Sequence, residues 1–326
     1  MVFGLSFVLS FAFSIVLAMP LIAWLRRLSY RQIAYEDAPK THASKSGTPT
    51  MGGLLFAVPL IVAAAITRLD ATVFAIVVLA VLCGLIGAAD DLAKIRGARN
   101  RGMRAPLKFA LTGVAAFIFI ALLGRAGDPA PYTLFVPFLG LFGGESSIAV
   151  APWIWIALSV CVVVASVHAV NLTDGLDGLA AGTVVPPLLA LTILAVAAGK
   201  PMAGVVAIAT VGAALGFLFY NHFPARVFMG DTGSLALGGV LAGTTIASDA
   251  QLLLPLIGGI FVAEAFSVIL QVITFKTTHK RIFRMSPLHH HYELGGWPET
   301  KVTHRFWATS AFLSLLGVLS IVPKPA

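Results

Sequence analysis

Long apolar runs recur along the whole chain, and they constrain its fold more than any other feature. Each run approaches the roughly 20 apolar residues that a helix needs to cross a bilayer. Charged residues make up only 11% of the 326 residues, against roughly 25% in soluble domains. The sequence therefore predicts an all-α polytopic membrane protein, a single integral membrane domain over 1–326. Ten spans are predicted, at 2–25, 51–67, 71–89, 109–124, 150–170, 179–199, 202–220, 232–248, 250–275 and 306–323.

The lysines and arginines divide unevenly between the two ends of these spans. Eighteen of the 22 lie in the first, third, fifth, seventh and ninth connections, and four lie in the other connections and the C-terminal tail. Because Lys and Arg collect in cytoplasmic loops, the odd-numbered connections are predicted to be cytoplasmic and both termini periplasmic. Orientation in the lipid bilayer thus accounts for the net charge of +8, and we expect no nucleic-acid partner.

Two predicted segments carry signals of irregular backbone. The run 250–275 contains Pro255 and the pair Gly258-Gly259, so we expect this span to be tilted or broken. The periplasmic connection 125–149 is rich in Gly, Pro and aromatic residues, a composition that suits a small hairpin.

Acids and histidines are also concentrated on the predicted cytoplasmic side. All eight histidines and nine of the 14 acidic residues lie in cytoplasmic connections or at cytoplasmic span ends. The preference of Lys and Arg for the cytoplasm does not explain this, because acids contribute little to that rule. The excess therefore predicts a cytoplasmic active site.

The sharpest polar cluster is the pair Asp90-Asp91, placed at the predicted C-terminal end of the third span. The helix dipole and mutual repulsion disfavour two carboxylates there. Mg²⁺, a hard cation bound by carboxylate and phosphate oxygens, would offset this cost. Lys94, one turn further on, would pair with phosphate or with the acids. Taken alone, the pair also fits a solvated helix end.

Two further clusters join or open spans. Asp174 and Asp177 are three residues apart, so they share a face if the segment is helical, and the adjacent glycines allow a ligand to approach the backbone. The segment 230–234 (Gly-Asp-Thr-Gly-Ser) opens the eighth span, where helix amides suit an anion and Asp231 suits a metal. Alone, each cluster also fits an ordinary capped turn or helix N-cap.

The remaining two clusters are the segment 45–53 and the run His289-His290-His291. The first brings a cation, hydroxyls and flexible backbone to the start of the second span, although it also fits a simple Gly/Pro turn. Neighbouring side chains of a helix or strand point apart, so the three histidines cannot easily bind one ion; a loop would aim one or two at a phosphate. Surface histidines are the alternative. Together the five clusters are typical of diphosphate chemistry with Mg²⁺.

These motifs, in this order, resemble those of the phospho-N-acetylmuramoyl-pentapeptide transferases, within the polyprenyl-phosphate N-acetylhexosamine-phosphate transferase superfamily (glycosyltransferase family 4). The similar stretches are 45–53, 90–94, 171–178, 221–234 and 287–301. The resemblance implies transfer of a sugar phosphate from UDP-N-acetylmuramoyl-pentapeptide to undecaprenyl phosphate, giving lipid I and UMP. It also implies an Mg²⁺ cofactor, a bacterial inner-membrane location with a cytoplasmic active site, and a homodimer.

The resemblance also implies roles for individual residues. Asp231 would bind Mg²⁺, Asp90 and Asp91 would serve the lipid phosphate, one of them as a candidate base, and His289 would contact the diphosphate. The residues implied to bind substrate are Lys45, Thr50, Lys94, Lys108, Asn171, Asp174, Asp177, Asn221, Phe228, His290 and His291.

Two other functions stay open on the sequence. One is a UDP-N-acetylglucosamine:undecaprenyl-phosphate phosphotransferase. The other, of a different class, is a secondary transporter, whose site would lie near the bilayer midplane. Only Glu264 lies well inside a predicted span, and its role is left open. For the transferase, direct attack by the lipid phosphate is favoured, and a covalent aspartyl-phosphate is the alternative.

Overall fold

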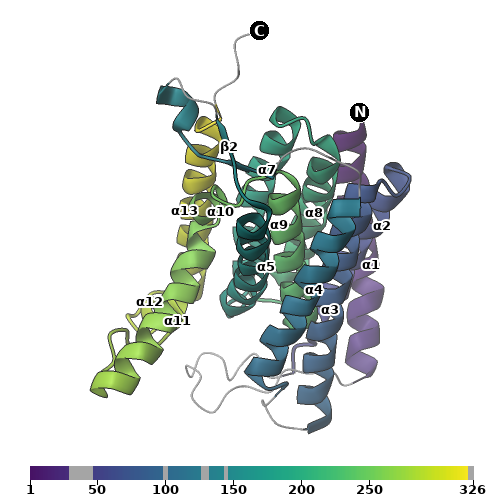
Figure 1. Ribbon diagram of the computed structural model, residues 1–326. Coiled ribbons are helices and arrows are strands. Elements are labelled where there is room, and N and C mark those ends of the chain that lie inside the picture. Colours follow the sequence, from purple (N-terminus) through teal and green to yellow (C-terminus); the bar gives the residue numbers. More distant parts are fainter. Residues whose placement is uncertain (29–46, 98–101, 126–131, 143–145, 322–326) are drawn as a thin grey trace.

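The computed structural model describes residues 1–28, 47–97, 102–125, 132–142 and 146–321. Long helices dominate it, running roughly side by side (Figure 1). The long helices are α1 (Val2–Arg27), α3 (Ala71–Gly97), α4 (Ala105–Arg125), α5 (Pro152–Thr173), α8 (Pro201–Asn221), α9 (Gly230–Ala247), α11 (Gly259–Thr278) and α13 (Glu299–Leu319). Shorter elements are η2 (Gly52–Phe56), α2 (Ala57–Ile66), β1 (Thr133–Phe135), η3 (Leu139–Phe142), β2 (Ser147–Ala149), α6 (Leu179–Thr183), α7 (Val185–Ala197), α10 (Leu254–Ile257) and α12 (Leu288–Glu293).

Seven helical segments in the described part of the chain are long and apolar enough to cross a membrane. They correspond to α1, α3, α4, α5, α6 with α7, α8 and α11. This confirms an all-α polytopic membrane protein. The other three predicted spans correspond to the shorter apolar helix Gly52–Ile66 and to α9 and α13, so the count of ten stays a prediction.

Helix α9 forms the centre of the bundle, and its residues from Thr232 to Ala247 are all buried. Small residues let neighbouring helices approach it closely, as is common in membranes. A Cβ at Gly238 would collide with the backbone of Val167 on α5. On another face, Gly243 lies against Ile76 of α3. Helix α9 is therefore held between helices that are distant in sequence.

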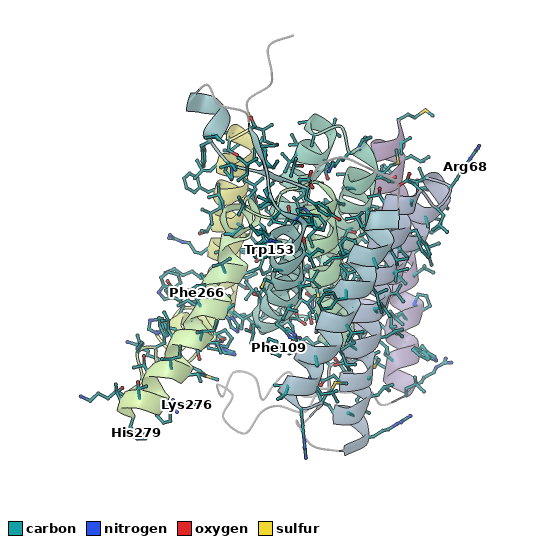
Figure 2. All side chains as sticks on the ribbon, viewed as in Figure 1. Arg68, Phe109, Trp153, Phe266, Lys276 and His279 are labelled. Carbon is teal, nitrogen blue, oxygen red and sulfur yellow. The ribbon has the colours of Figure 1, made fainter. Side chains whose placement is uncertain are left out.

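Both predicted irregularities are present. The run 250–275 is broken at Gly258, where α10 ends and α11 begins, and α11 leans away from the other helices (Figure 1). Phe266 on α11 is 58% exposed and points outward (Figure 2), as expected of a lipid-facing side chain. In the connection 125–149, β1 and β2 form an antiparallel hairpin with Thr133 opposite Ala149.

The two ends of the bundle differ in content. The hairpin, the N-terminus and the C-terminal end of α13 lie at one end, whereas α12 lies toward the other (Figure 1). Arg68 marks the first end, and Lys276 and His279 mark the second (Figure 2). The start of α1 and the end of α13 thus lie on one side, in agreement with an even number of spans.

The boundary predicted for the third span is wrong. Helix α3 continues to Gly97, so Asp90 and Asp91 lie inside a helix and not at its C-terminal end. The apolar run stops at Ala89, but Leu92, Ala93 and Lys94 are good helix formers and the helix continues through them. The argument from the helix dipole therefore does not apply to this pair, and other groups must stabilise it.

Candidate active site

Asp231, in the first turn of α9, is the centre of a charged cluster that joins four helices. Its Oδ2 atom lies 2.6 Å from the Lys108 Nζ of α4 and 3.1 Å from the Lys94 Nζ of α3. Its Oδ1 atom accepts a hydrogen bond of 3.0 Å from the Asn171 amide of α5. The lysine side chains are 26% (Lys94) and 13% (Lys108) exposed, so an anion can reach them.

The two adjacent carboxylates of α3 have different partners. Asp90 Oδ2 lies 2.7 Å from Lys94 Nζ, Asp90 Oδ1 lies 3.2 Å from Lys108 Nζ, and Oδ1 also accepts the Met103 N–H at 2.6 Å. Asp91 accepts the backbone N–H groups of Asp231 (3.1 Å) and Thr232 (2.9 Å) and the Thr232 hydroxyl (2.7 Å). Asp91 therefore caps α9 from another helix, and Asp90 fixes the two lysines.

Glycines without room for a side chain bring these elements together. A Cβ at Gly87 would overlap the Asp231 carbonyl, so Gly87 lets α3 approach the first turn of α9. A Cβ at Gly53 would overlap the backbone of Gly233 in the same way. Gly53 and Gly233 belong to motifs found in the sequence, and these glycines permit close packing of backbone.

The segment before η2 is tied to the residues before α9. Phe228 donates its N–H to the Pro49 carbonyl (2.8 Å) and accepts the Gly52 N–H (2.9 Å). This pairing holds the buried Thr50 beside Gly230, next to the Asp91 carboxylate. The Phe228 side chain is half-buried. Lys45 lies outside the described residues, and its role stays a prediction.

The loop after α5 carries Asp174 on one side and Asp177 on the other. The Asp177 carboxylate accepts the Ala225 N–H at 2.9 Å, and its own N–H is donated to Glu299 of α13 at 2.7 Å. Asn221 accepts the Gly178 N–H and donates to the Val227 carbonyl. Asp177 and Asn221 therefore hold the loop in place, while Asp174 remains half-buried beside the Asp231 cluster.

The three consecutive histidines have three different environments. His289 is fully buried, its Nδ1 lies 3.1 Å from Glu264 Oε1, and its Nε2 contacts Gly175. His290 Nδ1 is 2.7 Å from Glu293 Oε2. His291 Nδ1 accepts the Arg284 N–H at 3.2 Å. Only His289 is aimed at the loop of Asp174, so this is the imidazole that joins the site.

The carboxyl groups of Asp231 and Asp174 have opposite electrostatic environments: Asp231 lies beside lysines and Asp174 beside other acids. Burial alone would raise the pKa of Asp231, but the positive charges of Lys94 and Lys108 together hold it below its usual range. Burial and the negative charges of Asp231, Asp91 and Asp177 raise the pKa of Asp174 well above its usual 3.8. The neighbourhood of Asp174 therefore favours an added cation.

Replacing Asp174 by Asn is expected to raise the thermal unfolding midpoint of the metal-free protein in detergent at pH 8. The native state binds the Asp174 proton more tightly than the unfolded chain does, so stability falls as pH rises from the unfolded value toward the raised pKa. The variant lacks this loss, and its midpoint should depend less on pH over that interval. A midpoint below that of the wild type at pH 8 would contradict the electrostatic account.

The donors present fit Mg²⁺ bound jointly with a phosphate. The described residues contain no group of three or more His, Cys, Asp or Glu side chains placed to enclose a metal. Mg²⁺ keeps several waters and is commonly held by one or two carboxylates plus substrate phosphates. Asp231 and Asp174 supply such carboxylates, and no ion pair to Asp174 is made by the described part of the chain.

Some of the contacts that build the site carry no clear sequence signal. The Asn171 amide also donates to the Ser234 hydroxyl (2.9 Å). The Thr232 hydroxyl donates to Asp91, and Glu299 accepts the Asp177 N–H. Glu264 was noticed only as an isolated acid in an apolar run. Hydrogen-bond partners separated by 25 to 141 residues leave no local pattern, so packing alone reveals them.

Comparison with known proteins finds relatives over nearly the whole chain. The family model for glycosyl transferase family 4 matches residues 73–249, and a signature of phospho-N-acetylmuramoyl-pentapeptide-transferase matches 45–56. A phospho-N-acetylmuramoyl-pentapeptide-transferase of Heliobacterium modesticaldum is 44% identical over 98% of this chain and 97% of its own length. The chain belongs to the phospho-N-acetylmuramoyl-pentapeptide-transferase family. Transferases of the same name from Desulforamulus reducens (43% identity, 95% of this chain and 93% of that one) and Halalkalibacterium halodurans (41%, 96% of each) extend the match.

Family membership favours the muramoyl-pentapeptide branch over the rival functions. The matched model, 73–249, contains Asp90, Asp91, Asn171, Asp174 and Asp231. The relatives align over nearly the full chain, including the α11–α13 region that carries His289. The residues gathered around Asp231 thus fall within the segment that defines the family.

Proposed function

We propose that this enzyme transfers phospho-N-acetylmuramoyl-pentapeptide from UDP-N-acetylmuramoyl-pentapeptide to undecaprenyl phosphate, forming lipid I and UMP. The observation that carries the proposal is the cluster of Asp231, Lys94 and Lys108 at one end of an apolar bundle. The chain is also 44% identical to one such transferase over almost its whole length. A lipid substrate and a water-soluble nucleotide must meet at such a boundary.

The reaction brings two anions together, and the site supplies the opposing charge. Two unit charges about 4 Å apart repel by about 4 kcal/mol at an effective dielectric of about 20. Lys94 and Lys108 lie within 3.2 Å of carboxylate oxygens of Asp90 and Asp231. These acids keep the ammonium groups in place, which spares reorganisation when phosphate arrives.

In the proposed step, an oxygen of the lipid phosphate attacks the phosphorus that bears the sugar. The bond from that phosphorus to the bridging oxygen breaks, and UMP leaves with the bridging oxygen and the electron pair. A phosphate with a second pKa near 6 is largely dianionic at neutral pH, so no strong base is needed. Asp90 and Asp91 are already bonded to lysines and to α9, which suits positioning of the lipid phosphate site.

We assign Mg²⁺ to Asp231, with Asp174 next to it. When bound, the ion would neutralise charge on the diphosphate and on the leaving UMP. The lowered pKa of Asp231 keeps its carboxylate ionised and able to act as a ligand. The Asn171 amide holds one oxygen of that carboxylate at 3.0 Å and so fixes its orientation.

The orientation in the membrane follows from charge. We assign the end of the bundle with α12 and the Asp231 cluster to the cytoplasm, because the basic connections lie there, and the hairpin end to the periplasm. With α2, α9 and α13 counted as spans, the chain crosses the bacterial inner membrane ten times. The nucleotide sugar then reaches the site from the cytoplasm and undecaprenyl phosphate reaches it from the inner leaflet.

The purified protein is expected to incorporate label from UDP-N-acetylmuramoyl-pentapeptide into butanol-extractable lipid when undecaprenyl phosphate and Mg²⁺ are present. Chelation with EDTA should stop incorporation, and added Mg²⁺ should restore it. UDP-N-acetylglucosamine, offered in parallel, should give no labelled lipid. Incorporation from UDP-N-acetylglucosamine alone would favour the alternative, a UDP-N-acetylglucosamine:undecaprenyl-phosphate phosphotransferase. No incorporation from either sugar would contradict the transferase proposal.

The order of events is tested by leaving out the lipid acceptor. Direct attack predicts no UMP release from enzyme, Mg²⁺ and nucleotide sugar alone. A burst of UMP equal to the enzyme concentration would instead indicate a covalent aspartyl-phosphate intermediate. Quench-flow separation of UMP from substrate measures the burst directly.

A further inference from the structure

Glu264 is a fully buried carboxylate in α11, within a segment that is mostly apolar and partly lipid-facing. Exposed neighbours on the same helix include Phe266 and Ile269. Ionisable residues inside a membrane segment are costly and generally have a specific partner and a function. The partner here is the start of α12, the short helix that carries the three histidines.

Three donors from two consecutive residues converge on this carboxylate. Oε2 accepts the Leu288 N–H at 2.7 Å, and Oε1 accepts the His289 N–H at 3.2 Å. The His289 ring completes the set, with its Nδ1 3.1 Å from Oε1. A carboxylate accepts bonds at both oxygens, so Glu264 fixes both the backbone and the ring of His289.

This arrangement determines which ring nitrogen is available to a ligand. Facing a carboxylate that already accepts two N–H groups, Nδ1 must carry a proton to form its bond, and in a neutral ring Nε2 is then unprotonated. Nε2 is buried and has no hydrogen-bond partner among the described residues. It contacts Gly175, in the loop next to Asp174. An unpaired buried polar atom directed at the site indicates a missing ligand atom.

We propose that Glu264 is a positioning residue that holds His289 with Nδ1 protonated and Nε2 directed at a phosphate oxygen of the bound substrate. The inference rests on the proposed function and adds a residue that acts on the reaction through another. With Nδ1 bonded to the carboxylate, the unprotonated Nε2 would accept a hydrogen bond from a protonated phosphate oxygen or from a water molecule bound to the phosphate. No bond to carbon or phosphorus involves Glu264.

The kinetic test is a double-mutant cycle of Glu264→Gln and His289→Ala, with Glu264→Ala as the harsher variant. Gln has nearly the same shape as Glu but only one acceptor oxygen, so it can accept only some of the three hydrogen bonds from Leu288 and His289. Glu264→Gln should lower kcat by about 10–100-fold, with KM changed less, and Glu264→Ala should lower it further. In the His289→Ala background, Glu264→Gln should have little added effect, because the ring it positions is gone. Independent, multiplicative losses would overturn the proposal, as would full activity of both Glu264 variants.

A matched control separates positioning from general loosening of the α11–α12 connection. Gln271, on the same helix, is also buried and also holds that connection, through the backbone N–H groups of Ile282 and Phe283 and the Phe283 carbonyl. It makes no hydrogen bond to His289. Gln271→Ala should lower the thermal midpoint at least as much as Glu264→Gln while leaving kcat within a few-fold of wild type. A loss of kcat equal to that of Glu264→Gln would reduce Glu264 to a structural role.

A measurement without substrate keeps this test separate from the proposed reaction. ¹⁵N NMR of the protein labelled at histidine, with His289 assigned by its loss in His289→Ala, reports which ring nitrogen is protonated. Wild type should show a protonated Nδ1, and Glu264→Ala should show exchange between tautomers. A neutral His289 protonated only at Nε2 in the wild type would overturn the inference even if lipid I is made. The expected tautomer without lipid I formation would instead remove the proposed function alone.

Discussion

Asp231→Asn is expected to reduce the rate of lipid I formation by at least about a thousandfold. Removing one preorganised electrostatic group commonly costs 10²–10³ in turnover, and this substitution removes a proposed metal ligand as well. It also deprives Lys94 and Lys108 of a carboxylate that lies 3.1 and 2.6 Å from them. The thermal stabilisation that Mg²⁺ and nucleotide sugar give to the wild type should disappear in the variant. Turnover and thermal unfolding of the same preparations measure both effects.

Asp249→Asn is a matched control for this substitution. Asp249 also pairs with a lysine, at 2.7 Å from Lys200 Nζ, but it lies at the hairpin end and accepts the Thr133 hydroxyl of β1. Asn tolerates its left-handed backbone (φ 54°). Its turnover and its response to Mg²⁺ should match the wild type. Equal losses in the two variants, or substantial activity of Asp231→Asn, would remove Asp231 from the metal site.

Gly175→Ala is expected to lower turnover by about a hundredfold although it adds a single methyl group. A Cβ at this position would overlap the His289 ring at Nε2, and the ring cannot retreat because it is fully buried and bonded to Glu264. A displacement of about 1 Å in a catalytic geometry can cost about 10² in rate. Steady-state kinetics should show the loss mainly in kcat.

Gly113→Ala controls for the effect of the methyl group itself. A Cβ at Gly113, on α4, would meet no atom within 4 Å. Alanine in the middle of a helix is more stable than glycine by roughly 0.5–1 kcal/mol, so this variant should be fully active and at least as stable as wild type. Near-normal turnover of Gly175→Ala would show that the His289 ring does not need its present position.

Local sequence motifs identify many of the residues of the site. Asp90, Asp91, Asp231, Asn171 and Lys94 were all selected from local motifs, and the structure brings them together around α9. The sequence does not show what each of these residues contacts. Asp90 and Asp91 were expected to act as a pair, yet one fixes lysines and the other caps a helix. Likewise, the side chains of Asp177 and Asn221 bind the loop backbone, and their predicted place in a substrate pocket stays a prediction.

The sequence by itself determined the membrane class, the break at Gly258, the hairpin and the grouping of polar motifs at one end of the bundle. These follow from hydropathy, charge and backbone preference, which are properties of short stretches of chain. Only the tertiary structure decided the pairings, because a carboxylate finds its donors through packing. Asp91 and Thr232 are 141 residues apart, and Glu264 meets His289 through hydrogen bonds between α11 and the start of α12. Close contact at glycines such as Gly87 and Gly175 makes these pairings possible, and no local pattern encodes it.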